Sequence, residues 1–130
     1  MNLRDDDTIT GRRDEMLSFI RAHDPEGAEK LSKLGEKEAI LAKGNVYGER
    51  FTSRQFALVF DPLLTRAFER SQILEHLAKE KASVPGLAQA LKLPSNIVFD
   101  HVKELLRRDL IEIAGYEERD AIYRRKSPGT

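Results

Sequence analysis

One predicted helix in the C-terminal half of the chain carries side chains whose chemistry suits a nucleic-acid surface. Ser95 and Lys103 can reach phosphate oxygens, and the Asn96 amide can form two hydrogen bonds with adenine. Phe99 and Asp100 share the same outward face. Phosphates repel a carboxylate, although an aspartate can accept a hydrogen bond from cytosine N4. Ser95, Asn96 and Lys103 are therefore side chains that suit contact with DNA.

Three arginines complete the candidate DNA-binding set. Arg107 ends the same helix, Arg119 lies in a turn between two predicted strands, and Arg124 lies on the second strand. Three basic and three acidic residues balance over residues 95–109, and acidic residues also surround Arg119 in its turn. An equally weighted interpretation of these cations is therefore a solvated face with local ion pairs.

Metal, catalytic and cofactor chemistry find little support. The chain has no cysteine, which excludes a disulfide framework, thiolate redox chemistry and a cysteine metal site. His23, His76 and His101 stand apart in the sequence, and we expect His101 to pack rather than bind a metal. No glycine-rich phosphate loop and no interpretable Ser, His and Asp spacing is present. We expect no enzyme activity, no catalytic residue, no metal site and no cofactor.

Composition restricts how such a protein binds. The 130 residues contain 22 basic and 22 acidic side chains, so DNA binding requires a local patch rather than overall charge. No apolar run approaches the roughly 18 residues of a membrane span, and the sequence begins without the basic and apolar regions of a signal peptide. We expect no membrane association and a cytoplasmic location.

Helical patterns dominate the N-terminal half. Residues 1–11 are polar and are expected to be disordered. A short helical pattern over residues 12–22 stops at Asp24, which can cap a second helix that starts at Pro25. Gly44 gives this second helix a C-terminal stop. The apolar residues expected to form its buried stripe are Leu31, Leu34, Ile40 and Leu41.

The pattern is interrupted in the middle of the chain. Residues 46–51 fit a loop or a short strand equally well. Ser53 then offers a cap for a short helix over residues 54–60, which Asp61 and Pro62 are expected to end. A long apolar stripe follows Pro62 and predicts either one helix or two joined near residues 70–71.

The last half of the chain alternates short helices with tight turns. Ser83 is expected to cap a helix that ends at Leu91, and the next helix starts at once after Pro94. Two strands follow over residues 110–114 and 121–125 around a turn. The expected shared core consists of Leu74, Leu77, Leu87, Leu91, Val98, Val102, Leu105 and Ile111.

Four segments carry a resemblance to the ArsR and MarR families of bacterial regulators. They read SQILEHLA at residues 71–78, VPGLAQAL at 84–91, LPSNIVFDHVKEL at 93–105 and LIEI at 110–113. The resemblance implies a winged helix-turn-helix over residues 62–126, in which the third helix enters the DNA major groove and the hairpin is the wing. The fold class is mainly α with a small β-hairpin wing and additional N-terminal helices.

Residues outside the winged helix suggest how the protein assembles. Residues 12–61 form an N-terminal helical extension whose apolar content exceeds what the winged helix needs for its own core. A homodimer through this extension would present two copies of the DNA-binding surface to two half-sites. Residues 127–130 lack an apolar anchor and are expected to form a flexible tail.

Two functions of different classes follow. The leading one is a cytoplasmic, ArsR-like transcription regulator that binds double-stranded DNA as a dimer. The alternative is a winged-helix adaptor, or regulatory subunit of a larger complex, that does not bind DNA. Ile97 and Phe99 would then form an exposed apolar patch for a protein partner, rimmed by Asp100 and an acidic wing.

Overall fold

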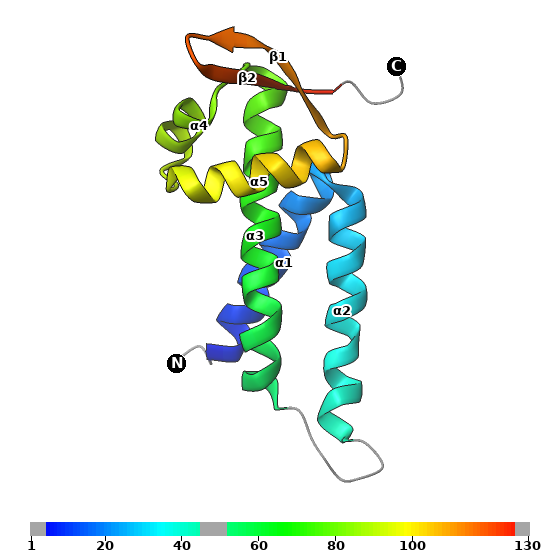
Figure 1. The fold of residues 1–130 in the computed structure, drawn as a ribbon. Coiled ribbons are helices and arrows are strands. Elements are labelled where there is room, and N and C mark those ends of the chain that lie inside the picture. Colours follow the sequence, from blue (N-terminus) through cyan, green and yellow to red (C-terminus); the bar gives the residue numbers. More distant parts are fainter. Residues whose placement is uncertain (1–4, 45–51, 127–130) are drawn as a thin grey trace. The chain divides into compact units, whose positions relative to one another are not determined.

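A computed structural model describes residues 5–44 and 52–126 and contains, within them, five helices and one two-stranded antiparallel hairpin (Figure 1). The expected fold class, mainly α with a small hairpin, is confirmed. The chain divides into two compact units, Met1–Phe68 and Glu69–Thr130. We call them the N-terminal unit and the C-terminal unit.

Helix α1 (Asp5–His23) starts earlier than the sequence suggests. The prediction that residues 1–11 are disordered is wrong from residue 5 onward, and residues 1–4 lie outside the described part of the chain. Extending a helix that is already nucleated costs far less than starting one, because each added residue gains a hydrogen bond. The helix is anchored by Ile20, which is fully buried, and its polar N-terminal turns extend from that anchor.

The junction between α1 and α2 (Pro25–Lys43) is fixed by a buried cap. The Asp24 side chain is only 4% exposed and accepts a hydrogen bond from the Gly27 backbone N–H at 3.2 Å. A Cβ on Gly27 would collide with the Asp24 carboxylate, so a side chain at this position would displace the capping group. The predicted start at Pro25 and stop at Gly44 are both confirmed.

Helix α3 (Ser53–Lys79) is a single helix, which corrects the predicted break at Asp61 and Pro62. Pro62 lies inside it, and the division between the two compact units falls within the same helix, between Phe68 and Glu69. A proline inside a helix costs roughly 3 kcal/mol because it removes a hydrogen bond and crowds the preceding turn. The buried stripe made by Phe56, Phe60, Leu64 and Ala67 keeps helical spacing across Pro62, and its burial outweighs that cost.

A capping box starts α3, and it begins one residue before the predicted cap at Ser53. The Gln55 backbone N–H donates to Thr52 Oγ1 at 3.1 Å, and the Thr52 backbone N–H donates to Gln55 Oε1 at 2.8 Å. These reciprocal bonds satisfy two N–H groups that the helix itself cannot pair. The segment 46–51, for which a loop and a strand were both open, lies outside the described residues.

The core of the N-terminal unit is built from helices alone. Phe56 and Phe60 stack within it at a centroid distance of 5.2 Å. The predicted stripe of α2 is only half correct, since Leu31 is buried while Ile40 and Leu41 are 67% and 40% exposed. The buried members of this core are Ile20, Ala28, Leu31, Phe56, Phe60, Leu64 and Ala67.

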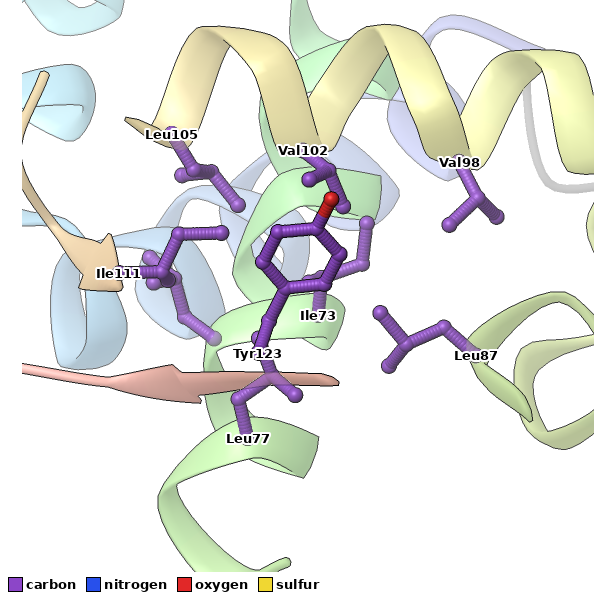
Figure 2. Close-up of a cluster of buried hydrophobic side chains, with 9 residues drawn as sticks. Ile73, Leu77, Leu87, Val98, Val102, Leu105, Ile111 and Tyr123 are labelled. Atoms are coloured by element: carbon purple, nitrogen blue, oxygen red, sulfur yellow. The ribbon is translucent and has the colours of Figure 1, made fainter. Parts of the chain in front are cut away.

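The C-terminal unit contains the end of α3, helices α4 (Val84–Leu91) and α5 (Ser95–Arg107), and strands β1 (Ile111–Glu117) and β2 (Asp120–Arg125). Side chains from all five elements meet in one core, much of which Figure 2 shows, with α5 above it and β2 below. The core predicted from the sequence is confirmed, with Leu91 at its edge rather than inside. Its buried members are Ile73, Leu74, Leu77, Leu87, Val98, Val102, Leu105, Ile111 and Tyr123.

Local signals position α4 and α5 as expected. Ser83 Oγ accepts a hydrogen bond from the Gly86 backbone N–H at 3.2 Å, which confirms the predicted cap of α4. Lys92 ends α4 in the left-handed conformation, with φ of 57°, and the chain turns directly into α5 at Ser95.

The hairpin is longer and tighter than predicted. Glu117 pairs with Asp120 across a two-residue turn, which corrects the six-residue turn placed over residues 115–120. Glu118 adopts a φ of 55° in this turn. A bulge between Ile113 and Gly115 accommodates one extra residue of β1. Strand pairing then continues beyond the bulge as far as Glu117 and Asp120, past the predicted strand ends.

Hydrogen bonds of the backbone and side chain of Lys126 hold the two strands together at the end of the hairpin opposite its turn. The Lys126 backbone N–H donates to the Leu110 carbonyl at 3.0 Å, and Lys126 Nζ donates to Asp109 Oδ1 at 2.8 Å. This hydrogen bond to Asp109 raises the pKa of Lys126. The segment before α4 is tied to β2 as well, since the backbone groups of Ala82 and Tyr123 exchange two hydrogen bonds of 3.1 and 2.8 Å. The predicted tail at residues 127–130 lies outside the described residues.

Candidate nucleic-acid interface

Helix α5 has one buried and one exposed face. Val98, Val102 and Leu105 are fully buried in the core, at the spacing of three and four residues that places side chains on one helix face. The opposite face consists of the exposed residues Ser95, Asn96, Phe99, Asp100, Lys103 and Arg107. All six candidate site residues of this helix therefore lie where an external ligand can reach them.

A surface depression of about 550 Å³ lies between the start of α5 and the hairpin. It brings together four of the predicted site residues, namely Ser95, Asn96, Phe99 and Arg119. The remaining predicted residues, Asp100, Lys103, Arg107 and Arg124, do not line it. Ser95 and Arg119, 24 positions apart in the sequence, line the same depression. After α5 the hairpin runs back along this helix toward its start (Figure 1).

Lys103 belongs to a small cluster on the exposed face of α5. Its Nζ atom lies 3.3 Å from Asp100 Oδ1 and 4.9 Å from the centroid of the Phe99 ring. The ammonium group therefore interacts with a carboxylate and with an aromatic face at once. Lys103 therefore contacts both Phe99 and Asp100, the aromatic and the acidic residue of this exposed face.

Arg107 and Arg124 also have acidic partners. Arg107 donates two hydrogen bonds to the Glu104 carboxylate, and these lower the pKa of Glu104 and raise that of Arg107. Arg124 Nε donates to Glu112 Oε1 at 2.9 Å across the two strands. The interpretation as local ion pairs is correct for these two arginines and for Lys103. Exposed pairs of this kind contribute little to stability because water screens them, so a phosphate can replace the carboxylate at little cost.

Arg119 differs from the other predicted cations. It is exposed at the hairpin turn, and within residues 5–44 and 52–126 no ion pair is formed by its guanidinium. Its position at the rim of the depression leaves a full positive charge available there.

Two tyrosines of the depression were not predicted. Tyr116 is 71% exposed, whereas Tyr123 is 7% exposed and faces the core below α5 (Figure 2). Burial raises the pKa of the Tyr123 hydroxyl, with a smaller contribution from Tyr116. The apolar run Ala121, Ile122 and Tyr123 was recognised as a strand, but it did not show which of its side chains is buried. Tyr116 was assigned to the turn, so its position on β1 was missed.

His101 packs on the inner side of α5, as expected. Its side chain is 5% exposed, and Glu69 Oε1 accepts a hydrogen bond from His101 Nε2 at 2.8 Å. This bond joins α5 to the part of α3 that belongs to the C-terminal unit. Glu69 was not predicted as a partner, since 32 residues separate it from the histidine.

Other kinds of site receive no support from the described residues. Residues 5–44 and 52–126 contain no group of three or more histidine, cysteine, aspartate or glutamate side chains that could hold a metal ion. In the same part of the chain, every helix is too short or too polar to cross a bilayer. Comparison with models of known protein families, with curated proteins and with solved structures found no match.

Proposed function

We propose that this protein is a small winged-helix transcription regulator, similar to the ArsR type, that binds double-stranded DNA through α5 and the hairpin. One observation carries the proposal: the polar start of α5 and the unpaired Arg119 line the same depression. A helix in the major groove can present Ser95 and Asn96 to phosphates and base edges, while a hairpin beside it reaches the flanking backbone.

The charge distribution supports a local mode of binding. The cations of α5 are balanced by Asp100 and Glu104 on the same helix, so the free protein has no broad positive surface there. Phosphates would compete with these exposed carboxylates for Lys103 and Arg107. We therefore expect few counterions to be released on binding, and a weaker salt dependence than that of strongly basic regulators.

Assembly as a cytoplasmic homodimer is part of the proposal. The helices of the N-terminal unit carry large apolar side chains that no described residue covers, including Leu58 at 71% and Val59 at 52% exposure. A second copy of the chain could cover them and supply the second DNA-binding surface. Sedimentation equilibrium should give a dimer mass for the wild type and a monomer mass for a Leu58→Glu, Val59→Glu double variant. A wild-type monomer at tens of micromolar would contradict the dimer.

Salt-titrated binding to duplex DNA tests the function. Fluorescence anisotropy with a labelled random duplex should show weak binding that falls as salt rises. Arg119→Ala should weaken it and reduce the salt slope by about one unit, because one phosphate contact is lost. Arg54→Ala is the matched control, since Arg54 is an exposed arginine of the N-terminal unit.

A charge reversal on α5 gives the opposite result. Asp100→Arg removes a repulsive carboxylate, frees Lys103 and adds a cation, so affinity should rise and the salt slope should steepen by about one unit. Absence of binding at low salt by both the wild type and Asp100→Arg would reject DNA binding.

A protein-binding adaptor is the second candidate, and the exposed aromatic side chains favour it. Phe99 is 48% exposed and Tyr116 is 71% exposed at the same depression, next to the acidic Asp120. Ile97, which was expected to extend this patch, is half-buried, and Tyr116 takes its place. If the depression binds a protein, Phe99→Ser should cost roughly 2 kcal/mol or more of partner affinity and leave any DNA binding unchanged.

A further inference from the structure

Asn96 and Phe99 form a pair on the exposed face of α5. They are three residues apart on one helix, so their Cβ atoms are neighbours at about 5–6 Å. Both side chains are exposed, and both line the depression beside the hairpin. A ligand that meets one of them therefore meets the other.

The two side chains have complementary preferences in the major groove. An asparagine amide fits adenine, donating to N7 and accepting from the N6 amino group. A phenylalanine ring makes an apolar contact with the C5-methyl group of thymine. Adenine and thymine of one base pair, or of two neighbouring pairs, present these groups on the same groove edge.

We propose that Asn96 and Phe99 are specificity-determining residues that together select A·T base pairs. The inference rests on the proposed DNA-binding function and names the bases that this surface recognises. A cytosine under Phe99 would offer no methyl group, so the apolar contact with the ring would be lost.

The surroundings of Phe99 favour contact through its free side. The ring is 48% exposed, so about half of its surface is packed and half remains available to a ligand. The Lys103 ammonium lies 4.9 Å from the ring centroid and holds the ring through a cation–π contact. Asp100, at 3.3 Å from Lys103, keeps this cation beside the ring. The ring is thereby positioned before DNA arrives.

The test begins with selection of bound duplexes from a random library by the full chain. The expected product is a site that contains at least one fixed A·T pair. Each thymine of the selected site is then replaced singly by deoxyuridine, which lacks only the C5-methyl group. Wild-type protein should lose about fourfold in affinity at the contacted thymine, the value expected for one methyl group removed from an apolar contact.

Variants assign the two contacts separately. Phe99→Ala should bind the thymine and deoxyuridine duplexes equally. Asn96→Ala should bind adenine and 7-deazaadenine duplexes equally, whereas the wild type should discriminate against the analogue that lacks N7. Matched controls are Ile113→Ala, an apolar residue of 46% exposure outside the depression, and Gln89→Ala, an exposed amide on α4. Both controls should discriminate as the wild type does.

The outcomes separate this inference from the proposed function. Selected duplexes that bind equally with thymine or deoxyuridine at every position would overturn the inference and leave DNA binding intact. A thymine preference that survives Phe99→Ala would overturn it as well. Failure of the full chain to retain any duplex would overturn both.

Discussion

The N-terminal unit buries two stacked phenylalanines between helices, whereas the C-terminal unit buries mainly aliphatic side chains between helices and a hairpin. Their uncovered apolar residues differ as well. In the N-terminal unit they lie along α2 and α3, for example at Ile40 and Leu58, while in the C-terminal unit Phe99 and Tyr116 meet at a depression. The same excess of apolar surface therefore suggests self-association in one unit and ligand recognition in the other.

Each unit also has a polar side-chain contact that joins two of its helices, and the two contacts differ in burial. In the N-terminal unit, Arg13 lies 2.9 Å from Asp61 and 3.8 Å from Glu38, and its side chain is 18% exposed. In the C-terminal unit, the His101 side chain that binds Glu69 is 5% exposed. Water can replace a lost partner of Arg13 more readily than a lost partner of His101. The contact in the C-terminal unit should therefore contribute more to stability.

The largest expected effect is the loss of the C-terminal core. Leu105→Asp places an unpaired carboxylate at a fully buried position, at a cost that exceeds much of the roughly 5–15 kcal/mol by which domains are stable. Amide resonances of residues 69–126 should lose their dispersion in a two-dimensional NMR spectrum. Ile113→Asp, at a position of 46% exposure in the same unit, is the control. An unchanged melting temperature for Leu105→Asp would disprove this core.

A matched pair of phenylalanine truncations compares the two units directly. Phe60→Ala should destabilise the protein by about 3–5 kcal/mol, because the ring is 3% exposed and packs on Phe56. Phe99→Ala should cost less than about 1 kcal/mol, since its ring is half exposed. Urea unfolding monitored by circular dichroism measures both. Equal losses would show that burial does not distinguish these rings.

The two polar contacts can be compared in the same way. Glu69→Ala leaves the buried His101 ring nitrogen without its partner and should cost about 1–3 kcal/mol. Arg13→Ala removes a partly exposed ion pair together with a cation–π contact to Phe60 at 5.2 Å, and should cost about 1 kcal/mol. Melting temperatures of the two variants and of an exposed control, Glu80→Ala, rank these contributions. A larger loss for Arg13→Ala would reverse the comparison.

The smallest effect is expected at Ser71, at the start of the C-terminal part of α3. Its side chain is fully buried, and its hydroxyl has no hydrogen-bond partner within the described residues. Ser71→Ala should therefore leave stability unchanged or raise it by about 1 kcal/mol, because a buried unsatisfied hydroxyl is removed. Differential scanning calorimetry would show this shift. A destabilised Ser71→Ala variant would indicate that the hydroxyl has a bound partner, such as a water molecule.

Signals that act over a few residues were predictable from the sequence. The caps at Asp24 and Ser83 and the buried stripe of α5 depend on neighbouring residues, and all three are confirmed. The helix break predicted at Pro62 is wrong. The helix-breaking preference of one proline is outweighed by the burial of apolar side chains in the helical turns on both sides of it. The turn of the hairpin was misplaced because the bulge after Ile113 shifts the alternation of β1 by one residue.

The candidate site was predictable as a set of residues and not as an arrangement. The exposed face of α5 follows from helical periodicity, which identified Asn96 and Phe99. Its electrostatics depend on which side-chain rotamers come into contact. The sequence indicated local ion pairs in general, but it did not identify Asp100 as the partner of Lys103 or Glu69 as the partner of His101. The depression itself requires the hairpin to fold back on α5, and no local pattern encodes that geometry.

The fastening of the hairpin by Lys126 has a practical consequence for protein engineering. Its backbone N–H and its ammonium group reach Leu110 and Asp109, so the last described residue closes the strand pair at the end opposite its turn. A truncation before residue 126 would remove both bonds and let the strand ends separate. A purification tag or fused reporter should therefore be joined after Lys126, so that the hydrogen bonds of Lys126 with Leu110 and Asp109 are kept.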